Sequence, residues 1–170
     1  FELVTEVEMK IKIYSKDGYG SANKSILLYS SQNSADKETI DITKAVTYNL
    51  EGGNIKKTKL KSEGEFMEQV NKYYRQKKIM MPDVKEGSVV EYRYTIRSPF
   101  ITVFPDWDFQ KGIPVNHSEY TTKIPEYFSY NPNFRGYYVP KINRTKSNVA
   151  YTYTSKERSG PLVTKPTFEN

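Results

Sequence analysis

Residues 88–97 read SVVEYRYTIR, and this stretch decides the fold that we expect. Val90, Tyr92, Tyr94 and Ile96 alternate along it with residues that are mostly polar or charged. Successive side chains of a β-strand point to opposite faces, so a period of two predicts a strand with one buried face. Because the pattern holds over the whole stretch, we expect this strand to lie at the centre of its sheet.

Shorter stretches with the same period lie elsewhere in the chain. In residues 7–14, for example, Val7, Met9, Ile11 and Ile13 alternate with charged residues. We expect further strands over residues 7–14, 25–30, 40–50, 55–60, 73–81, 106–110, 117–124 and 149–154. Repeated strands that are separated by turn residues predict a mainly all-β fold, an antiparallel β-sandwich with at most one or two short helices.

Two local patterns add detail to this prediction. Residues 40–50 are apolar at alternate positions, and we expect that face to pack in the core; the positions are Ile42, Val46, Tyr48 and Leu50. Residues 63–70 have a helical pattern, because Phe66, Met67 and Val70 share one face at helical spacing.

The composition excludes several kinds of site. The 170 residues include 15 Tyr, one His and no Cys, which excludes thiol catalysis, disulfides and sites built from several His or Cys ligands. No apolar run approaches the roughly 20 residues of a membrane-spanning helix. We find no internal repeat and no linker, so we expect a single domain over residues 1–170. The chain opens at Phe1 directly into a strand-like pattern, and we interpret it as excised from a longer multidomain protein.

The net charge of +6 raises the question of a nucleic-acid partner. Acidic residues are interleaved with the basic ones, and the densest basic stretch is Lys56, Lys57, Lys59 and Lys61. Lysines spaced in this way along a strand form a solvated face and protect an exposed sheet edge. We therefore expect no nucleic-acid partner.

Three arrangements of polar residues resemble parts of catalytic or metal-binding sites, and none is a complete site. His117 and Glu119 lie two apart and could share a metal ion, but a third ligand would have to come from elsewhere in the fold. Asp106 and Asp108 flank Trp107 and are similar to glycosidase carboxylate pairs, although nothing marks either as an acid with a raised pKa. No serine lies in a nucleophile motif, and a hydrolase would need a cleft joining the histidine, an aspartate and a serine. We expect no catalytic residue, no metal and no cofactor in this chain.

Aromatic side chains are the remaining candidates for ligand binding. They are Trp107, Tyr127, Tyr130, Tyr137 and Tyr138, of which the tyrosines lie in a stretch rich in Pro and Asn. Exposed rings could stack on sugars, peptides or bases, whereas buried rings would close one end of the sandwich. A coplanar, exposed pair of rings would favour carbohydrate binding, and burial would exclude it.

Residues 72–99 resemble a bacterial family of domains of unknown function, with MPDVKEGSVVEYRYTIRSP over 81–99 as the most specific part. In that family the domain lies immediately N-terminal to a transglutaminase-like domain of an exported protein. AVTYNLEGGNIKKTKL over 45–60 is similar to the family's hairpin. FPDWDFQKGIPVNHSEYTTKIPE over 104–126 is similar to its region after the central strand.

The resemblance implies an all-β sandwich in an extracytoplasmic (periplasmic or cell-surface) protein. Transglutaminase-like domains use a Cys-His-Asp arrangement, and no such residue can be transferred to a chain without Cys. Our main hypothesis is a non-catalytic accessory domain that positions a downstream transglutaminase- or protease-like domain, or its protein substrate. The expected partner is the adjacent C-terminal domain of the same polypeptide, with a protein or polysaccharide ligand as a further candidate. The alternative is a carbohydrate-binding module that uses exposed aromatic residues.

Overall fold

The structure is a computed structural model, and it describes residues 1–30, 37–102, 104–125, 127–131, 133–136, 141, 153–155 and 163–165. The chain forms two compact units, Phe1–Pro105 and Asp106–Asn170, and each is considered by itself. The expectation of a single domain over residues 1–170 stays a prediction.

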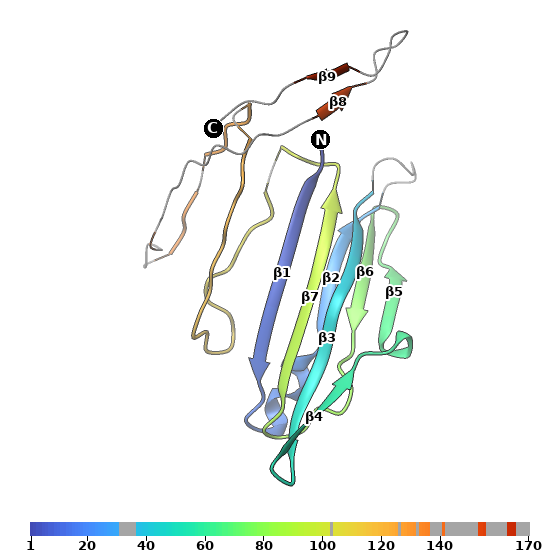
Figure 1. Ribbon diagram of the computed structural model, residues 1–170, viewed down its shortest axis with the longest axis vertical. Coiled ribbons are helices and arrows are strands. Elements are labelled where there is room, and N and C mark those ends of the chain that lie inside the picture. The colour runs from blue at the N-terminus through green and yellow to red at the C-terminus, as the bar shows by residue number, and fades with distance from the viewer. Residues whose placement is uncertain are drawn as a thin grey trace. The chain divides into compact units, whose positions relative to one another are not determined.

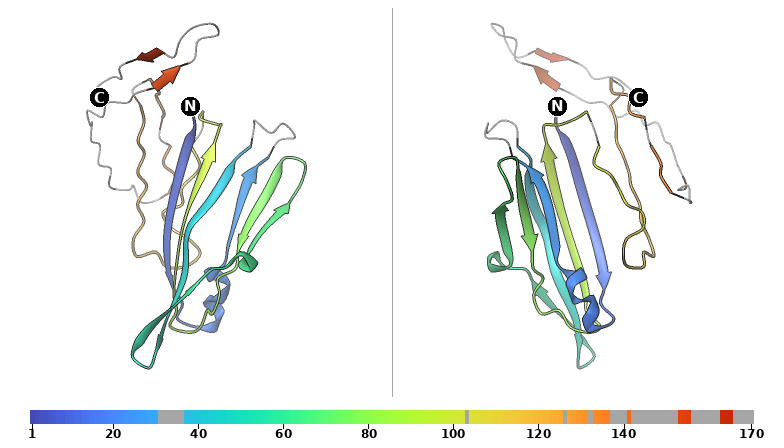
Figure 2. Two further views of the ribbon diagram at one scale, coloured as in Figure 1. Left: turned by 45° about the vertical axis from the view of Figure 1, so that its right-hand side comes forward. Right: turned by 180° about the vertical axis from the view of Figure 1, so that it is seen from behind.

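The first unit contains two antiparallel sheets that form separate layers (Figures 1 and 2). The four-stranded sheet has the order β1-β7-β3-β4, formed by β1 (Leu3–Lys12), β7 (Val89–Ser98), β3 (Thr39–Glu51) and β4 (Asn54–Lys59). The three-stranded sheet has the order β2-β6-β5, formed by β2 (Lys24–Tyr29), β6 (Tyr74–Ile79) and β5 (Glu65–Gln69). Two short 3-10 helices, η1 (Lys16–Ala22) and η2 (Ser62–Gly64), lie between strands. The predicted β-sandwich with at most two short helices is confirmed.

Strand β7 is central, as its alternating sequence predicts. It pairs with β1 on one side and with β3 on the other. Val90, Tyr92 and Tyr94 are all buried on its inner face. The facing sheet contributes Leu28 and Ile79, which are fully buried, so the core lies between the two layers.

The inward face of β3 differs from the prediction in its second half. A β-bulge between Ile42 and Lys44 places an extra residue on β3 opposite β7. Beyond such a bulge the side chains exchange faces, because the period of a strand is two. Thr47 is therefore buried, whereas Leu50 is 74 % exposed. Of the predicted positions Ile42, Val46, Tyr48 and Leu50, Val46 is buried at 7 % exposure, Ile42 and Tyr48 are half-buried, and only Leu50 is exposed.

The helix predicted over residues 63–70 is wrong. Most of that stretch is the strand β5, which pairs with β6, and only the 3-10 turn η2 precedes it. A helix of this length is marginal in water, whereas the free edge of β6 offers hydrogen-bond partners to the backbone. Phe66, Met67 and Val70 do not share a buried face, and each is at least 44 % exposed.

The second unit has little regular structure in its described residues. Strands predicted over residues 106–110 and 117–124 are absent there, and none of the described residues pairs with these stretches in a β-ladder. A two-stranded ladder joins β8 (Tyr153–Ser155) to β9 (Val163–Lys165), and β9 was not predicted. The predicted strand over 149–154 overlaps β8, and its residues 149–152 lie outside the described residues. Across the described residues, no helix is long and apolar enough to cross a membrane.

Candidate functional site

Trp107, the first residue predicted to bind a ligand, contacts side chains of its own unit. Its ring stacks on Tyr120 with 5.8 Å between centroids and an interplanar angle of 18°. The indole Nε1 donates a hydrogen bond to Ser118 Oγ at 3.1 Å, and Lys111 Nζ lies 5.5 Å from the ring centroid. Burial raises the pKa of the Tyr120 hydroxyl, to which the charge of Asp106 adds. The indole ring is thus half-buried, and it holds Lys111, Ser118 and Tyr120 of this unit together.

The other predicted aromatic residues do not form a flat platform within the described part of the chain. Tyr127 is 46 % exposed, and its ring meets Phe128 edge to face at an interplanar angle of 85°. Tyr130 is tilted by 36° against the same phenylalanine. Tyr137 and Tyr138 lie outside the described residues. The predicted binding role of these side chains stays a prediction.

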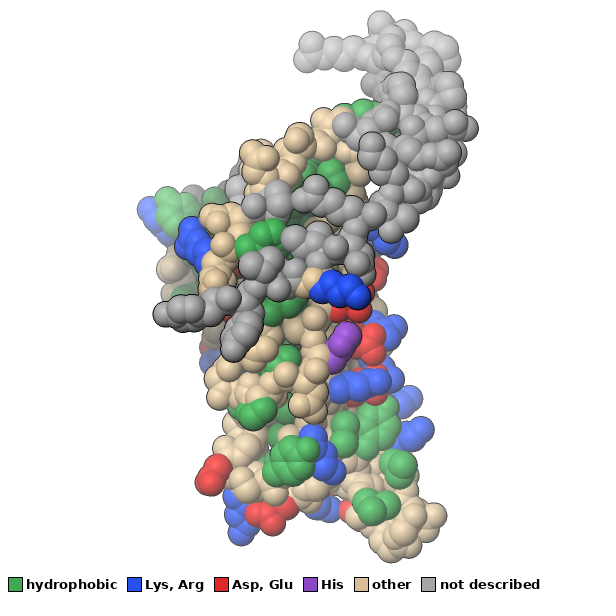
Figure 3. Space-filling model, turned by 90° about the vertical axis from the view of Figure 1, so that its left-hand side faces the viewer, with side chains coloured by type: hydrophobic (Ala, Val, Ile, Leu, Met, Phe, Trp, Pro, Cys, Tyr) green, Lys and Arg blue, Asp and Glu red, His purple; other side chains and the backbone are tan. Residues whose placement is uncertain are grey.

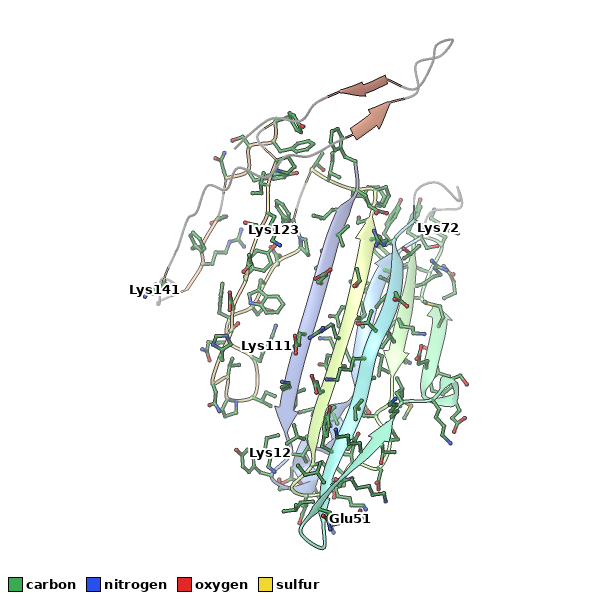
Figure 4. The ribbon with its side chains drawn as sticks, viewed as in Figure 1. Lys12, Glu51, Lys72, Lys111, Lys123 and Lys141 are labelled. Carbon is green, nitrogen blue, oxygen red and sulfur yellow. The ribbon has the colours of Figure 1, made fainter. Side chains whose placement is uncertain are left out.

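The polar candidates of the second unit are solvated pairs. His117 Nε2 lies 3.6 Å from Glu119 Oε2, and both side chains are exposed. The histidine is the purple side chain in Figure 3. Asp108 pairs with Lys111 at 3.5 Å (Lys111 is labelled in Figure 4). Among the described residues, no three His, Asp or Glu side chains come together in a group that could hold a metal ion.

The segment 81–88, which gives the chain its most specific sequence pattern, builds a polar cluster in the first unit. We call the cluster the Asn49 hub; its members are Asn49, Asp83, Lys85 and Ser88. Asn49 Nδ2 donates to the Asp83 carbonyl oxygen at 2.8 Å and to its carboxylate at 3.2 Å. Ser88 Oγ donates to Asn49 Oδ1 and accepts the Lys85 N–H at 2.8 Å. The hub therefore connects β3 to the turn that leads into β7.

Charged side chains surround the hub and neutralise one another. Lys85 Nζ lies 2.8 Å from Glu51 and 3.1 Å from Asp83, and Lys56 lies within 3.6 Å of both carboxylates. The hydrogen bond from Lys85 lowers the pKa of the Asp83 carboxyl, and the one to Glu51 raises the pKa of Lys85. Ser88 is fully buried, so its hydroxyl supports the turn and is not accessible to a substrate.

A hollow of about 340 Å³ lies beside this region. Its lining combines apolar and charged groups: Thr58, Lys59, Leu60, Lys61, Glu63, Gly64, Met80 and Pro82. Gly64 fits there because a Cβ atom would come within 2.9 Å of the Met80 carbonyl oxygen. The one hydroxyl in the lining, that of Thr58, already donates to Asp83 at 3.3 Å, so the hollow presents no activated nucleophile.

The outer surface of the four-stranded sheet gathers lysines around one buried carboxylate. Strand register aligns Lys10, Glu91, Val46 and Lys59 in one row across the sheet, and Lys12, Val89, Tyr48 and Lys57 in the next. We call this surface the basic face; it comprises these two rows and Lys44. It points away from the core because Val90 and Tyr92 fill the inner face of the same strand. The sequence did not reveal it, since its lysines are distributed over three strands.

Glu91 is the centre of the basic face. Only 8 % of its side chain is exposed, and its carboxylate lies 2.7 Å from Lys44 Nζ and 3.9 Å from Lys10 Nζ. The Tyr48 hydroxyl donates to the second carboxylate oxygen at 2.9 Å. The Lys44 hydrogen bond, helped by Tyr48 and Lys10, outweighs desolvation and lowers the pKa of Glu91. The same hydrogen bond raises the pKa of Lys44.

We expect Glu91→Gln to lower the free energy of unfolding by about 1–2 kcal/mol at neutral pH, because charge-assisted hydrogen bonds to Lys44 and Tyr48 are lost. A carboxylate whose pKa is lower in the folded state stabilises the protein at pH values above its pKa in the unfolded state, which is near 4.3. This stabilisation is lost as the pH falls through the lower pKa of the folded state. The difference between wild type and variant should therefore shrink below about pH 4. Urea unfolding across this pH range measures it. Glu8→Gln, at an exposed carboxylate paired with Arg93, is the matched control with an effect below about 1 kcal/mol.

Comparison with known proteins identifies a family but no characterised relative. The model of the DUF3857 family, described as a "Domain of Unknown Function with solved-structure structure", matches residues 2–159. No curated protein matches the sequence. A solved structure from Parabacteroides distasonis, described as a "putative protease", is similar with a TM-score of 0.48 and 10% identity. The similarity covers 57% of this chain and 20% of the other, so the chain spans about a fifth of that protein's length.

Proposed function

The chain belongs to the DUF3857 family of unknown function, and from this we propose that it is a non-catalytic accessory domain of a larger exported bacterial protein. In this proposal it supports or positions a downstream transglutaminase- or protease-like domain, or the protein substrate of that domain. The location is extracytoplasmic, and the first partner is the adjacent C-terminal domain of the same polypeptide. The pattern over residues 81–99, which resembles domains that precede transglutaminase-like domains, supports this arrangement.

The observation that carries the proposal is that the polar groups of residues 81–88 form hydrogen bonds inside the protein. Asp83, Lys85 and Ser88 all direct their hydrogen-bonding atoms into the Asn49 hub, where they hold a turn against β3. A catalytic group must meet a substrate, whereas Ser88 is fully buried and Asp83 is paired with lysines. The most characteristic part of the sequence thus has a structural task, as expected of a supporting domain.

The experiment is a calorimetric titration of this chain with the separately purified domain that follows it in the parent protein. Saturable association supports the proposal, and no association at the highest concentrations contradicts it. The same chain is titrated with a panel of polysaccharides. Glycan binding that disappears in Trp107→Ala, without association with the neighbouring domain, would replace the proposal by the carbohydrate-binding alternative.

A further inference from the structure

Two pairs of lysines flank a strip on the basic face that is apolar apart from Glu91. Lys10 and Lys12 form one pair on β1, and Lys57 and Lys59 form the other on β4. Three strand intervals of about 4.8 Å separate the pairs, so they stand roughly 14 Å apart. Within each pair the residues are two apart on one strand, which spaces their Cα atoms by roughly 6.6 Å.

The charge of this surface is not balanced from within. Five ammonium groups, those of Lys10, Lys12, Lys44, Lys57 and Lys59, surround the single carboxylate of Glu91, which leaves a net charge of +4. Glu91 accepts contacts from Lys44 and Lys10, whereas no carboxylate lies within 4.0 Å of the other three ammonium groups in the described part of the chain. The neighbouring Arg93 and Glu8 pair with each other at 2.7 Å and add no net charge. The surface therefore attracts carboxylates that the described residues of the unit do not supply.

The strip between the lysine pairs contains the Glu91 carboxylate, which Lys44 and Lys10 contact, and is otherwise apolar up to the tip of the β3–β4 hairpin. The half-buried Tyr48 and Val89 form its middle beside the buried Val46, and Lys57 Nζ lies 5.8 Å from the Tyr48 ring centroid. Leu50 and Ile55 are opposite each other in register at its end, and they are 74 % and 66 % exposed. An occupant with apolar groups at this end would remove both side chains from water.

We propose that the basic face binds an extended acidic segment of a protein, which lies along the strip between the two lysine pairs. An extended chain directs successive side chains to alternate sides, with residues i and i+2 about 6.6 Å apart on the same side. A run of acidic residues thus places carboxylates beside both lysine pairs at the lysines' own spacing, and a following apolar residue covers Leu50 and Ile55. This spacing favours an extended protein segment over a lipid surface, whose headgroups have no fixed register. The inference rests on the proposed interaction function and names the chemistry of the partner.

The probe is a short fluorescein-labelled peptide in which a run of glutamates precedes a pair of leucines, titrated with the full chain by fluorescence anisotropy. We expect saturable binding that weakens with added salt, because the lysines are solvent-exposed. Lys57→Gln combined with Lys59→Gln should weaken it by about tenfold, and so should Lys10→Gln combined with Lys12→Gln. Lys37→Gln combined with Lys72→Gln removes the same charge elsewhere in the first unit (Lys12 and Lys72 are labelled in Figure 4) and should change affinity by less than about twofold. Two independent lysine pairs keep the test valid if one double variant fails to fold.

Several results would overturn the inference. One is that a peptide with glutamine in place of glutamate binds as tightly as the glutamate peptide. Another is that the control variant Lys37→Gln combined with Lys72→Gln loses as much affinity as the lysine-pair variants. A third is tighter binding to vesicles containing phosphatidylglycerol, or to a single-stranded oligonucleotide, than to the glutamate peptide. The domain that follows in the parent protein is titrated with the same variants. Suppose that both lysine-pair variants associate with that domain as the wild type does, and that the peptide does not bind. This result overturns the inference and leaves the proposed function standing. Peptide binding without association with that domain contradicts the proposed function and leaves the acidic-segment site on the basic face standing.

Discussion

Replacing Tyr92 with alanine should lower the free energy of unfolding by about 3–5 kcal/mol, the largest effect that we expect from a single substitution. Tyr92 is 1 % exposed at the centre of β7, where Met9 of β1 and Ala45 of β3 flank it in register. Its ring also stacks on Tyr94 with 6.3 Å between centroids. Truncation removes the largest fully buried side chain and leaves a cavity between three strands, which the sheet cannot close without breaking its ladders.

Urea unfolding followed by circular dichroism measures this effect, and the melting temperature should fall by roughly 10 °C. Tyr92→Phe is the matched control, because it keeps the ring and removes only the hydroxyl that donates to Met9 Sδ at 2.8 Å. A thioether is a weak acceptor, so we expect a loss below about 1 kcal/mol for this variant. Burial raises the pKa of the Tyr92 hydroxyl, which therefore stays protonated in the folded protein. An unchanged melting midpoint in Tyr92→Ala would contradict the central place of β7 in the core.

The position of β7 could be predicted because its pattern is local. Tyr92 and Tyr94 alternate with Glu91 and Arg93, and burial on one side of a strand requires only that alternation. The same rule located β1, whose buried residue Ile11 lies within the expected stretch 7–14. The strand β2 was expected from the apolar run Ile26–Leu28, and it too lies within its expected stretch.

The predictions were wrong where pairing with a neighbouring strand determines the local structure. The bulge after Ile42 depends on the register with β7, and nothing in residues 40–50 marks it. Phe66, Met67 and Val70 fit one helical face, yet pairing with the free edge of β6 holds the backbone of Phe66 and Met67 in β5, so tertiary pairing overrides local preference. Residues 117–124 show the opposite case, since a partly alternating sequence forms no strand where none of the described residues pairs with it.

Neither the basic face nor the buried Asn49 hub could be predicted from the sequence. The lysines around Glu91 come from β1, β3 and β4, and only the strand order brings them together. Asn49 and Ser88 are 39 residues apart, so no spacing rule connects them. What could be recognised was the segment that supplies Asp83 and Ser88, although its pattern did not disclose that these residues form a buried cluster.

Asn49→Ala should lower the free energy of unfolding by about 2–3 kcal/mol, because buried hydrogen-bonding groups then lack partners. Asn49 is 4 % exposed, and its amide donates to the Asp83 carbonyl oxygen and accepts from Ser88 Oγ. The variant leaves the fully buried Ser88 hydroxyl without its acceptor. Asn54→Ala is the matched control, since Asn54 is exposed and donates only a long hydrogen bond of 3.4 Å to Gly52, and its cost should stay within about 0.5 kcal/mol.

A double-mutant cycle separates the hub from the general cost of truncating a buried side chain. If Asn49 and Ser88 act through the hydrogen bond that joins them, then Asn49→Ala combined with Ser88→Ala costs less than the sum of the single variants, by about 1 kcal/mol. Once one partner is gone, removal of the other no longer breaks that bond or leaves an unpaired group. Additive losses would mean that the two side chains contribute separately. The turn over residues 83–87 would then be held by its own backbone, with Asp83 and Gly87 both at positive φ (53° and 86°), and not by its connection to β3.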